Sequence, residues 1–98
     1  MRVGVCGAGG RMGREVCRAV ESEPALVLVC GVDPVCAGTG LDELVPGHGG
    51  GITVAAGPES LVESGAEVMV DFSIAPAARE NVPYALERGI ACVVGTTG

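Results

Sequence analysis

Lysine and tryptophan are absent from the sequence, and Phe72 and Tyr84 are its only aromatic residues. A hydrophobic core must therefore be built from valine, alanine, leucine, isoleucine, cysteine and methionine side chains. The six basic residues are all arginine, and the formal net charge at pH 7 is −6. Because nucleic-acid binding relies on basic side chains that neutralise phosphates, this acidic balance predicts that nucleic acid is not a partner.

The cysteine pattern argues against two further classes of protein. The five cysteines are an odd number, and no two of them have C-x-x-C spacing, so we expect neither a disulfide framework nor a metal site. Cys6, Cys30 and Cys92 lie in apolar segments, where reduced thiols behave as small hydrophobic groups and fit a cytoplasmic location. The apolar run after Arg2 is too short for a signal peptide. We expect no transmembrane segment and no membrane partner.

A glycine-rich stretch near the N-terminus, VGVCGAGGRMG at residues 3–13, is the most informative part of the sequence. It begins with alternating small apolar residues, which suit a buried strand. Gly7, Gly10 and Gly13 follow at a spacing of three, and helical periodicity then continues over residues 11–22. The predicted apolar stripe of this helix consists of Met12, Val16, Ala19 and Val20. Strand, glycine turn and helix in this order form the phosphate-binding unit of a dinucleotide-binding fold.

The glycines of this turn have different physical roles. Gly7 lets the chain turn sharply off the strand, and Gly13 lets the helix pack tightly on it. Because Gly9 and Gly10 have no Cβ, their backbone N–H groups can approach a pyrophosphate. The helix N-terminus adds unpaired N–H groups and a partial positive charge, which stabilise an anion. The alternative is a glycine turn without a ligand, but its place directly after a strand favours the anion site.

Two kinds of basic residue need to be weighed as candidates for the site. Arg11 lies inside the turn and is the better candidate for contacting a ligand. Arg14 and Arg18 lie further along the helix, where a solvated helix face explains them as well as a ligand does. The only histidine, His48, lies among glycines and is predicted to be an exposed loop residue rather than a catalytic one.

Strands and helices alternate along the chain, which predicts one α/β domain over residues 1–98. Right-handed crossovers imply a Rossmann-like, doubly wound parallel sheet with strand order 3-2-1-4-5, truncated after strand five. The second strand is apolar almost throughout and should be central. Ser73 is a candidate N-cap of the last helix, and Pro83 should kink that helix or leave its first segment irregular. The predicted strands are residues 2–6, 26–32, 52–55, 67–72 and 90–94; the predicted helices are residues 11–22, 58–65 and 73–88, with a helical turn at 41–45.

Several polar features follow strands of this sheet, at the edge where ligands bind in such folds. Asp33 ends the second strand, where an acidic residue can accept hydrogen bonds from an adenosine ribose; the alternative is an aspartate that starts a turn before Pro34. Asp71 is better explained by a turn role than by catalysis, since no basic residue adjoins it in sequence. Phe72 fits a side chain that covers a cofactor and an ordinary core residue equally well.

Three motifs together resemble a known family: G-A-G-G-R-M-G at 7–13, D-F-S at 71–73 and G-T-T-G at 95–98. In this order and spacing, and over the whole chain, they resemble the N-terminal cofactor-binding domain of dihydrodipicolinate reductases. The resemblance implies reduction of a cyclic imine with NADH or NADPH in the diaminopimelate route to lysine. It also implies a site for that cofactor, with the pyrophosphate at the glycine turn, the ribose at Asp33 and the nicotinamide near the G-T-T-G segment. The residues so implicated are Gly7, Ala8, Gly9, Gly10, Arg11, Met12, Asp33, Phe72, Gly95, Thr96 and Thr97.

The same resemblance implies what this sequence is missing. The family's substrate domain follows the G-T-T-G segment and carries a histidine pair, a lysine general acid and a second glycine-threonine loop. We therefore expect this chain to be the cofactor half alone, with no catalytic residue of its own, no reductase activity and no family-type homotetramer. The alternatives are a stand-alone nucleotide-binding or sensing module, and the cofactor domain of another dehydrogenase, such as a homoserine or sugar dehydrogenase.

Overall fold

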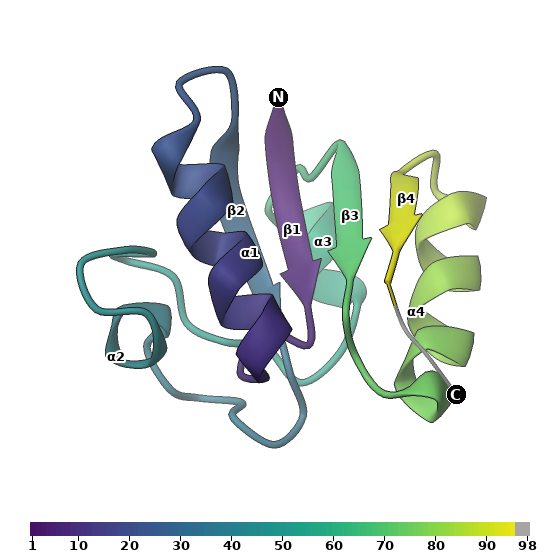
Figure 1. Ribbon diagram of the computed structural model, residues 1–98. Coiled ribbons are helices and arrows are strands. Elements are labelled where there is room, and N and C mark those ends of the chain that lie inside the picture. The colour runs from purple at the N-terminus through teal and green to yellow at the C-terminus, as the bar shows by residue number, and fades with distance from the viewer. Residues whose placement is uncertain (96–98) are drawn as a thin grey trace.

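Four parallel strands form the sheet of the computed structural model, which describes residues 1–95 (Figure 1). Their order across the sheet is β2-β1-β3-β4, so β1 lies between β2 and β3 and pairs with both in parallel. Because all pairings are parallel, the carboxyl ends of the strands lie along the same edge, which is the lower edge in Figure 1. The strands are β1 (Arg2–Cys6), β2 (Val27–Val32), β3 (Val68–Asp71) and β4 (Ala91–Val94).

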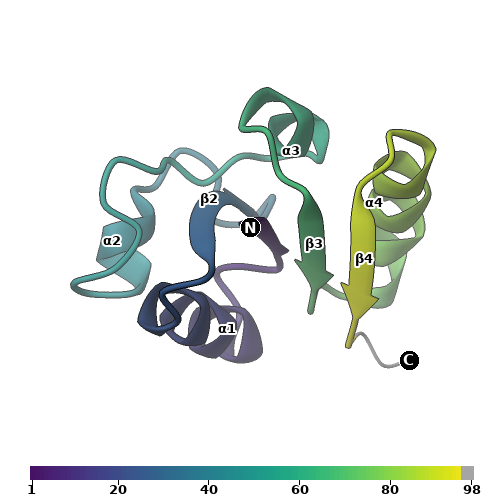
Figure 2. The ribbon, with the colours of Figure 1, turned by 90° about the horizontal axis from the view of Figure 1, so that it is seen from above.

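Helices cover both faces of this sheet. The view from above shows α1 on one side and α3 and α4 on the other (Figure 2). The alternation of side chains along β1 explains the two layers, since Val3 and Val5 join the core under α1 and Cys6 joins the core on the opposite face. The helices are α1 (Arg11–Ser22), α2 (Leu41–Leu44), α3 (Glu59–Glu63) and α4 (Ala75–Glu87).

The prediction of five strands in the order 3-2-1-4-5 is corrected, because the segment at 52–55 forms no strand in the part of the chain that the structure describes. It lies beside β2, as predicted, but it contributes only isolated bridges, Ala55 to Val32 in parallel and Thr53 to Gly40 in antiparallel. Consequently β2, which we expected to be central, is an edge of the four-stranded sheet. The other neighbour relations follow the predicted order.

The segment does not become a strand because its pairing with β2 is limited to Ala55. Ala55 exchanges bonds with the β2 end, donating its N–H to Gly31 and accepting that of Asp33, both at 2.9 Å. Val54 instead donates its N–H to Thr39 O at 2.8 Å, on the loop that precedes α2. Thr53, the next residue whose backbone groups would face β2, makes no hydrogen bond to it and bridges Gly40 instead, so no continuous ladder with β2 forms.

The start of α4 also differs from the prediction. Its N-cap is Ile74, whose side chain has no polar atom for a capping bond, and the predicted N-cap, Ser73, directs its hydroxyl to the Asp71 carboxylate instead. Pro76 lies in the first turn, where a missing N–H costs no helical bond. The expected irregular segment is not found, since α4 continues without interruption from Ala75 through Pro83 to Glu87.

The predicted apolar stripe of α1 needs a similar correction. The buried residues of this helix are Gly13, Cys17 and Val20, whereas Met12 is 52% exposed. The buried face is thus rotated from the predicted one, because the glycine at position 13 contacts the turn directly.

All five cysteines are free thiols, as expected. Burial raises the pKa of Cys17 to about 11 and also raises the pKa values of Cys6 and Cys30. These buried thiols are therefore protonated at neutral pH and pack as small hydrophobic groups. Within residues 1–95, no helix combines the length and apolarity needed to cross a membrane.

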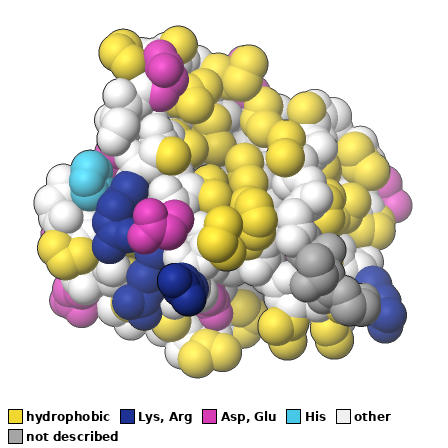
Figure 3. Space-filling model, in the orientation of Figure 1, with side chains coloured by type: hydrophobic (Ala, Val, Ile, Leu, Met, Phe, Trp, Pro, Cys, Tyr) yellow, Lys and Arg dark blue, Asp and Glu magenta, His cyan; other side chains and the backbone are white. Residues whose placement is uncertain are grey.

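One part of the sheet has little helical cover. On the side of α1, that helix packs on β1 and β2 and leaves the β3–β4 half open. Val70 reaches the core under α1, and its register partner Val93 lies on the same face with 57% of its surface exposed. Figure 3, drawn from this side, shows hydrophobic side chains gathered on the surface. Within the described residues, β4 pairs only with β3 and so has a free edge.

We expect the 98-residue chain to self-associate at high concentration through β4, because a free edge with apolar side chains is a template for strand pairing. The net charge of −6 opposes but does not abolish this association. Light scattering should detect species larger than a monomer, and Val93→Glu should restore the monomer. Val62→Glu is the matched control, since Val62 is 49% exposed on α3. A monodisperse wild-type monomer, or equal effects of both substitutions, would contradict this prediction.

Candidate functional site

The glycine turn between β1 and α1 is fastened to the end of β2. The N–H groups of Gly7 and Ala8 both donate to Val32 O, at 2.7 and 3.2 Å. Gly7 has a φ of +78°, and a Cβ at this position would lie 2.7 Å from the backbone of Phe72. Only glycine fits both the positive φ and the close approach, so the turn brings the ends of β1, β2 and β3 together.

The contact between α1 and this turn depends on Gly13. A Cβ at Gly13 would lie 1.9 Å from Gly7 O and 2.9 Å from the Ala8 Cα. This agrees with the predicted role of Gly13 in tight packing of the helix. The first turn of α1 therefore begins directly against the end of β1.

The hydrogen bonds of the turn show which N–H groups can receive an anion. Gly9 and Gly10, whose N–H groups we expected to face a pyrophosphate, use them within the protein, donating to Asp33 Oδ2 and to Gly7 O. Within residues 1–95, the N–H groups of Arg11, Met12 and Gly13 have no hydrogen-bond acceptor. These three groups belong to the first turn of a 12-residue helix, where the helix dipole also favours negative charge.

Asp33 lies half-buried immediately after β2 and accepts two backbone hydrogen bonds. Its Oδ2 accepts the N–H of Gly9, and its Oδ1 accepts the N–H of Val35, each at 3.0 Å. The turn role that was the alternative for this residue is therefore present. A carboxylate has about four acceptor positions, so both oxygens keep capacity for hydroxyl donors of a ligand.

A cleft of about 400 Å³ lies along this edge of the sheet. Of the eleven predicted site residues, it brings together Gly7, Gly9, Gly10, Asp33 and Phe72. Its remaining lining residues come from the two segments that follow β2 and β3: Pro34, Val35, Cys36, Ser73, Ile74 and Ala77. The lining is mostly apolar, with polar groups at the glycine turn and at Asp33, which is the usual character of a small-molecule site.

Four of the other predicted residues lie around the cleft rather than in its lining. Ala8 is fully buried beneath the turn, and Arg11 and Met12 are exposed at the start of α1. Gly95 follows β4, where it donates its N–H to Asp71 O at 2.8 Å and lies against the Phe72 ring. Thr96 and Thr97 lie outside the described residues.

Asp71 and Phe72 take different positions at the end of β3. The fully buried Asp71 accepts the N–H of Ser73 on Oδ1 at 2.8 Å and also the Ser73 hydroxyl. The predicted turn role of Asp71 is therefore confirmed. Phe72 is half-buried, and its ring lies between the cleft and Gly95, so it is not an ordinary core residue.

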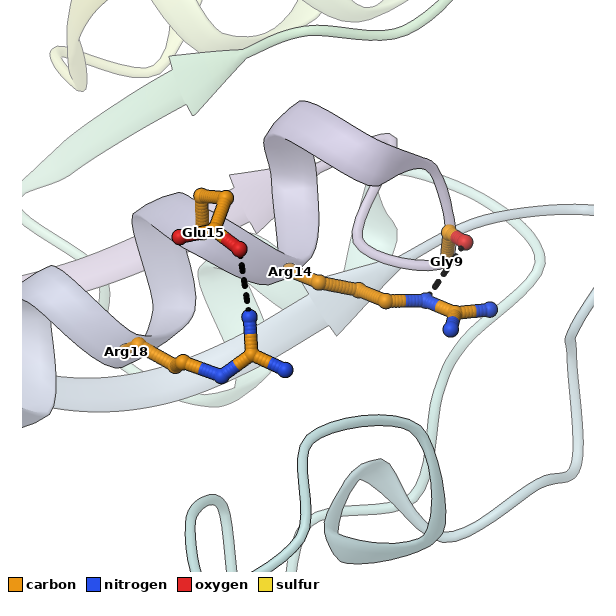
Figure 4. Close-up of polar contacts among 4 residues, drawn as sticks. All are labelled: Gly9, Arg14, Glu15 and Arg18. Carbon is orange, nitrogen blue, oxygen red and sulfur yellow. Dashed lines mark hydrogen bonds and ion pairs between the residues drawn. The ribbon is translucent and has the colours of Figure 1, made fainter.

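Sequence reasoning left Arg14 open as a candidate for this site and did not predict Cys36. Arg14 donates from Nε to Gly9 O at 3.0 Å, whereas Arg18 pairs with Glu15 at 2.7 Å on the exposed helix face (Figure 4). Helical side chains point back toward the N-terminus, so the place of Arg14 one turn into α1 was a usable signal. Cys36 lines the cleft beside Asp33, and its sequence context gave no comparable signal.

His48 lies outside the cleft lining. It is half-buried rather than exposed, with Nδ1 3.3 Å from Glu21 Oε1. Glu21 also accepts the N–H of Gly49 at 2.6 Å. These two contacts connect the glycine-rich loop around His48 to the end of α1. No group of three potential metal ligands occurs within the part of the chain that the structure describes.

Comparisons with known proteins agree with one another. The family described as "Dihydrodipicolinate reductase, N-terminus" matches residues 1–98. The 4-hydroxy-tetrahydrodipicolinate reductase of Symbiobacterium thermophilum is 43% identical over 101 residues, covering all of this chain and 40% of that protein. That of Rubrobacter xylanophilus is 42% identical over 99 residues, covering 36% of that protein. The chain thus spans about two fifths or less of the length of these relatives.

A solved structure shows the same fold in a longer protein. A myo-inositol dehydrogenase from Corynebacterium glutamicum superposes with a TM-score of 0.78 and 25% sequence identity, over 96% of this chain and 27% of that one. The α/β fold with a parallel sheet is therefore shared with a dehydrogenase.

Proposed function

The chain belongs to the family of dihydrodipicolinate reductase N-terminal domains, and on that premise we propose that it binds NADH or NADPH. The proposed reaction of the whole enzyme is the reduction of 4-hydroxy-tetrahydrodipicolinate to tetrahydrodipicolinate in diaminopimelate and lysine biosynthesis. The curated relatives are named 4-hydroxy-tetrahydrodipicolinate reductase. The observation that carries the proposal is the row of three unpaired N–H groups at the start of α1, next to a cleft with Asp33 at its edge.

The residues in and around the cleft fit the parts of such a cofactor. The N–H groups of Arg11, Met12 and Gly13 can hold the pyrophosphate, because they are donors at a positive helix end. Asp33 can accept hydrogen bonds from the adenosine ribose with its remaining acceptor capacity. Phe72 and Gly95 lie at the opposite end, where the apolar ring can pack on the nicotinamide. When bound, the cofactor supplies a hydride, and the chain's own residues bind and orient it.

The remaining parts of the reaction are assigned by proposal to the rest of the reductase. The curated relatives are more than twice as long as this chain. We assign the binding of the imine and the donation of its proton to the part of those relatives that this chain does not match. Thr96 and Thr97 keep the proposed place beside the nicotinamide that the family motif implies. A cytoplasmic location is part of the proposal, and the five free thiols support it.

We expect NADH to bind at least as tightly as NADPH. The Asp33 carboxylate can accept hydrogen bonds from both ribose hydroxyls of NADH, whereas the 2′-phosphate of NADPH removes a donor and places like charges together. Pro34 follows directly and offers neither charge nor N–H, and no basic residue occurs between Arg18 and Arg79. The exposed Arg11 is the one side chain at the turn that is available to offset the phosphate.

Titrations of both cofactors into the wild type, Arg11→Ala and Arg18→Ala test this preference. Equal affinities that become NADH-selective in Arg11→Ala alone would show that Arg11 accommodates the phosphate. Arg18→Ala removes the same charge but only a Glu15 contact, so its selectivity should match the wild type. A tenfold preference for NADPH, about 1.4 kcal/mol in the opposite direction, would reject the role given to Asp33. Failure of both cofactors to bind would reject the proposed function.

A further inference from the structure

Gly9, in the middle of the glycine turn, has both of its backbone polar groups held by charged side chains. Its N–H donates to Asp33 Oδ2 at 3.0 Å, across 24 residues of sequence. Its carbonyl oxygen accepts Arg14 Nε at 3.0 Å, from the first turns of α1 (Figure 4). Hydrogen bonds to charged groups are about twice as strong as neutral ones, so these two bonds restrain the middle of the turn.

Asp33 is itself held in position by further hydrogen bonds. The Asp33 N–H donates to Ala55 O at 2.9 Å, its carbonyl accepts the N–H of Cys36 at 3.2 Å, and its Oδ1 accepts the N–H of Val35. Together with the bond from Gly9, these bonds connect Asp33 to three segments of the chain: the glycine turn, residues 35–36 and residue 55. Arg14 is half-buried and extends from a regular helix.

We propose that Asp33 and Arg14 form a clamp on Gly9 that holds the glycine turn open for a pyrophosphate. Glycine has more backbone freedom than any other residue, and this turn has four glycines within seven residues. With the Gly9 peptide fixed, the start of α1 is held in place. The N–H groups of Arg11, Met12 and Gly13, which are unpaired because they lie in the first helical turn, then keep their direction. Asp33 is then a positioning residue for the pyrophosphate as well as an acceptor for the ribose. The inference rests on the proposed function for the identity of the ligand, but the clamp exists without it.

The clamp and the charge of Asp33 act on a bound anion in opposite directions. A carboxylate near an anion site repels the anion, so removing it without any other effect would tighten binding. Loss of the clamp frees the turn, so the same removal would weaken binding. Asp33→Ala loses charge and acceptor together, whereas Asp33→Asn loses the charge but keeps one acceptor oxygen, which can accept the Gly9 N–H when the Val35 N–H gives up its bond. The two variants therefore separate positioning from repulsion.

Amide hydrogen exchange without any ligand tests the clamp itself. In Asp33→Ala, the Gly9 amide should exchange about 10- to 100-fold faster than in the wild type, as expected for loss of a hydrogen bond to a charged acceptor. Asp33→Asn should retain most of the protection. Asp42→Ala is the matched control, an exposed aspartate in the first turn of α2, and should leave Gly9 unchanged. Unchanged exchange at Gly9 in Asp33→Ala, with β1 and β3 still protected, would overturn the clamp.

Titration with inorganic pyrophosphate, followed by the amide shifts of residues 11–13, tests the consequence for binding. We expect Asp33→Asn to bind at least as tightly as the wild type and Asp33→Ala to bind at least tenfold more weakly. Arg14→Ala should also weaken binding tenfold or more, and Arg18→Ala, with the same loss of charge one turn further on, less than threefold. Tighter binding by Asp33→Ala, or no binding of pyrophosphate by the wild type, would overturn the positioning role. A wild type that binds pyrophosphate but not NADH would refute the proposed function and leave the clamp standing.

Discussion

The purified 98-residue chain is expected to bind reduced cofactor and yet show no turnover of 4-hydroxy-tetrahydrodipicolinate. Reduction of an imine requires the carbon to be held against the hydride donor while a proton reaches the nitrogen. Holding two reactants together is worth about 7–11 kcal/mol, and general acid help contributes about 10²–10⁴-fold in rate. Loss of both leaves a rate that cannot be distinguished from background.

We expect the described residues to offer no group for either task. The sequence contains no lysine, His48 pairs with Glu21 away from the cleft lining, and the buried Asp71 carboxylate is bonded to Ser73. The measurement is the oxidation of NADH in the presence of the imine, with a full-length relative as the positive control. A parallel NADH titration shows that the chain is folded and loaded. Turnover by this chain above the enzyme-free rate would contradict the assignment of the chemistry to another part of the reductase.

Gly13→Ala is expected to lower the free energy of unfolding by about 2 kcal/mol and to weaken NADH binding more than tenfold. The added Cβ would lie 1.9 Å from Gly7 O and 2.7 Å from the Gly7 carbonyl carbon. These are backbone atoms at the end of β1, so α1 must move away from the turn. Overpacking of this kind costs up to about 3 kcal/mol, and the better helix propensity of alanine returns about 1 kcal/mol. The clash exceeds the propensity gain, and the displaced helix end no longer faces the anion.

Urea unfolding and NADH titration measure the two effects of Gly13→Ala. The matched control is Gly50→Ala, because Gly50 is exposed and a Cβ there would meet nothing within 4 Å. That variant should stay within about 0.5 kcal/mol of the wild type and bind NADH normally. A Gly13→Ala protein as stable as Gly50→Ala would show that the turn and the helix can separate without cost. It would also remove the structural reason for glycine at this position.

The sequence by itself determined those features that depend on short stretches of chain. Strand, glycine turn and helix follow one another within 22 residues, and the observed helix has the predicted bounds. Gly13 was predicted to pack against the turn because its spacing from Gly7 brings it to the first helical turn. Asp33 was predicted at the cleft because parallel strands end along one edge. Each of these inferences needs only local periodicity, glycine stereochemistry and the direction of the strands.

Which partner each polar group takes, when several are possible, depends on the folded geometry around it. Residues 52–55 have a strand-like pattern, but only Ala55 bonds to β2, and Thr53 bridges Gly40 on the loop before α2 instead. Ser73 is a good N-cap by type, and the nearby Asp71 carboxylate takes its hydroxyl. Arg14 and Arg18 are equivalent in sequence, and only Arg14 reaches Gly9. In each case the residue type allows several bonds, and the folded path of the backbone, at the glycine turn, at the end of β3 and beside the loop before α2, decides which bond forms.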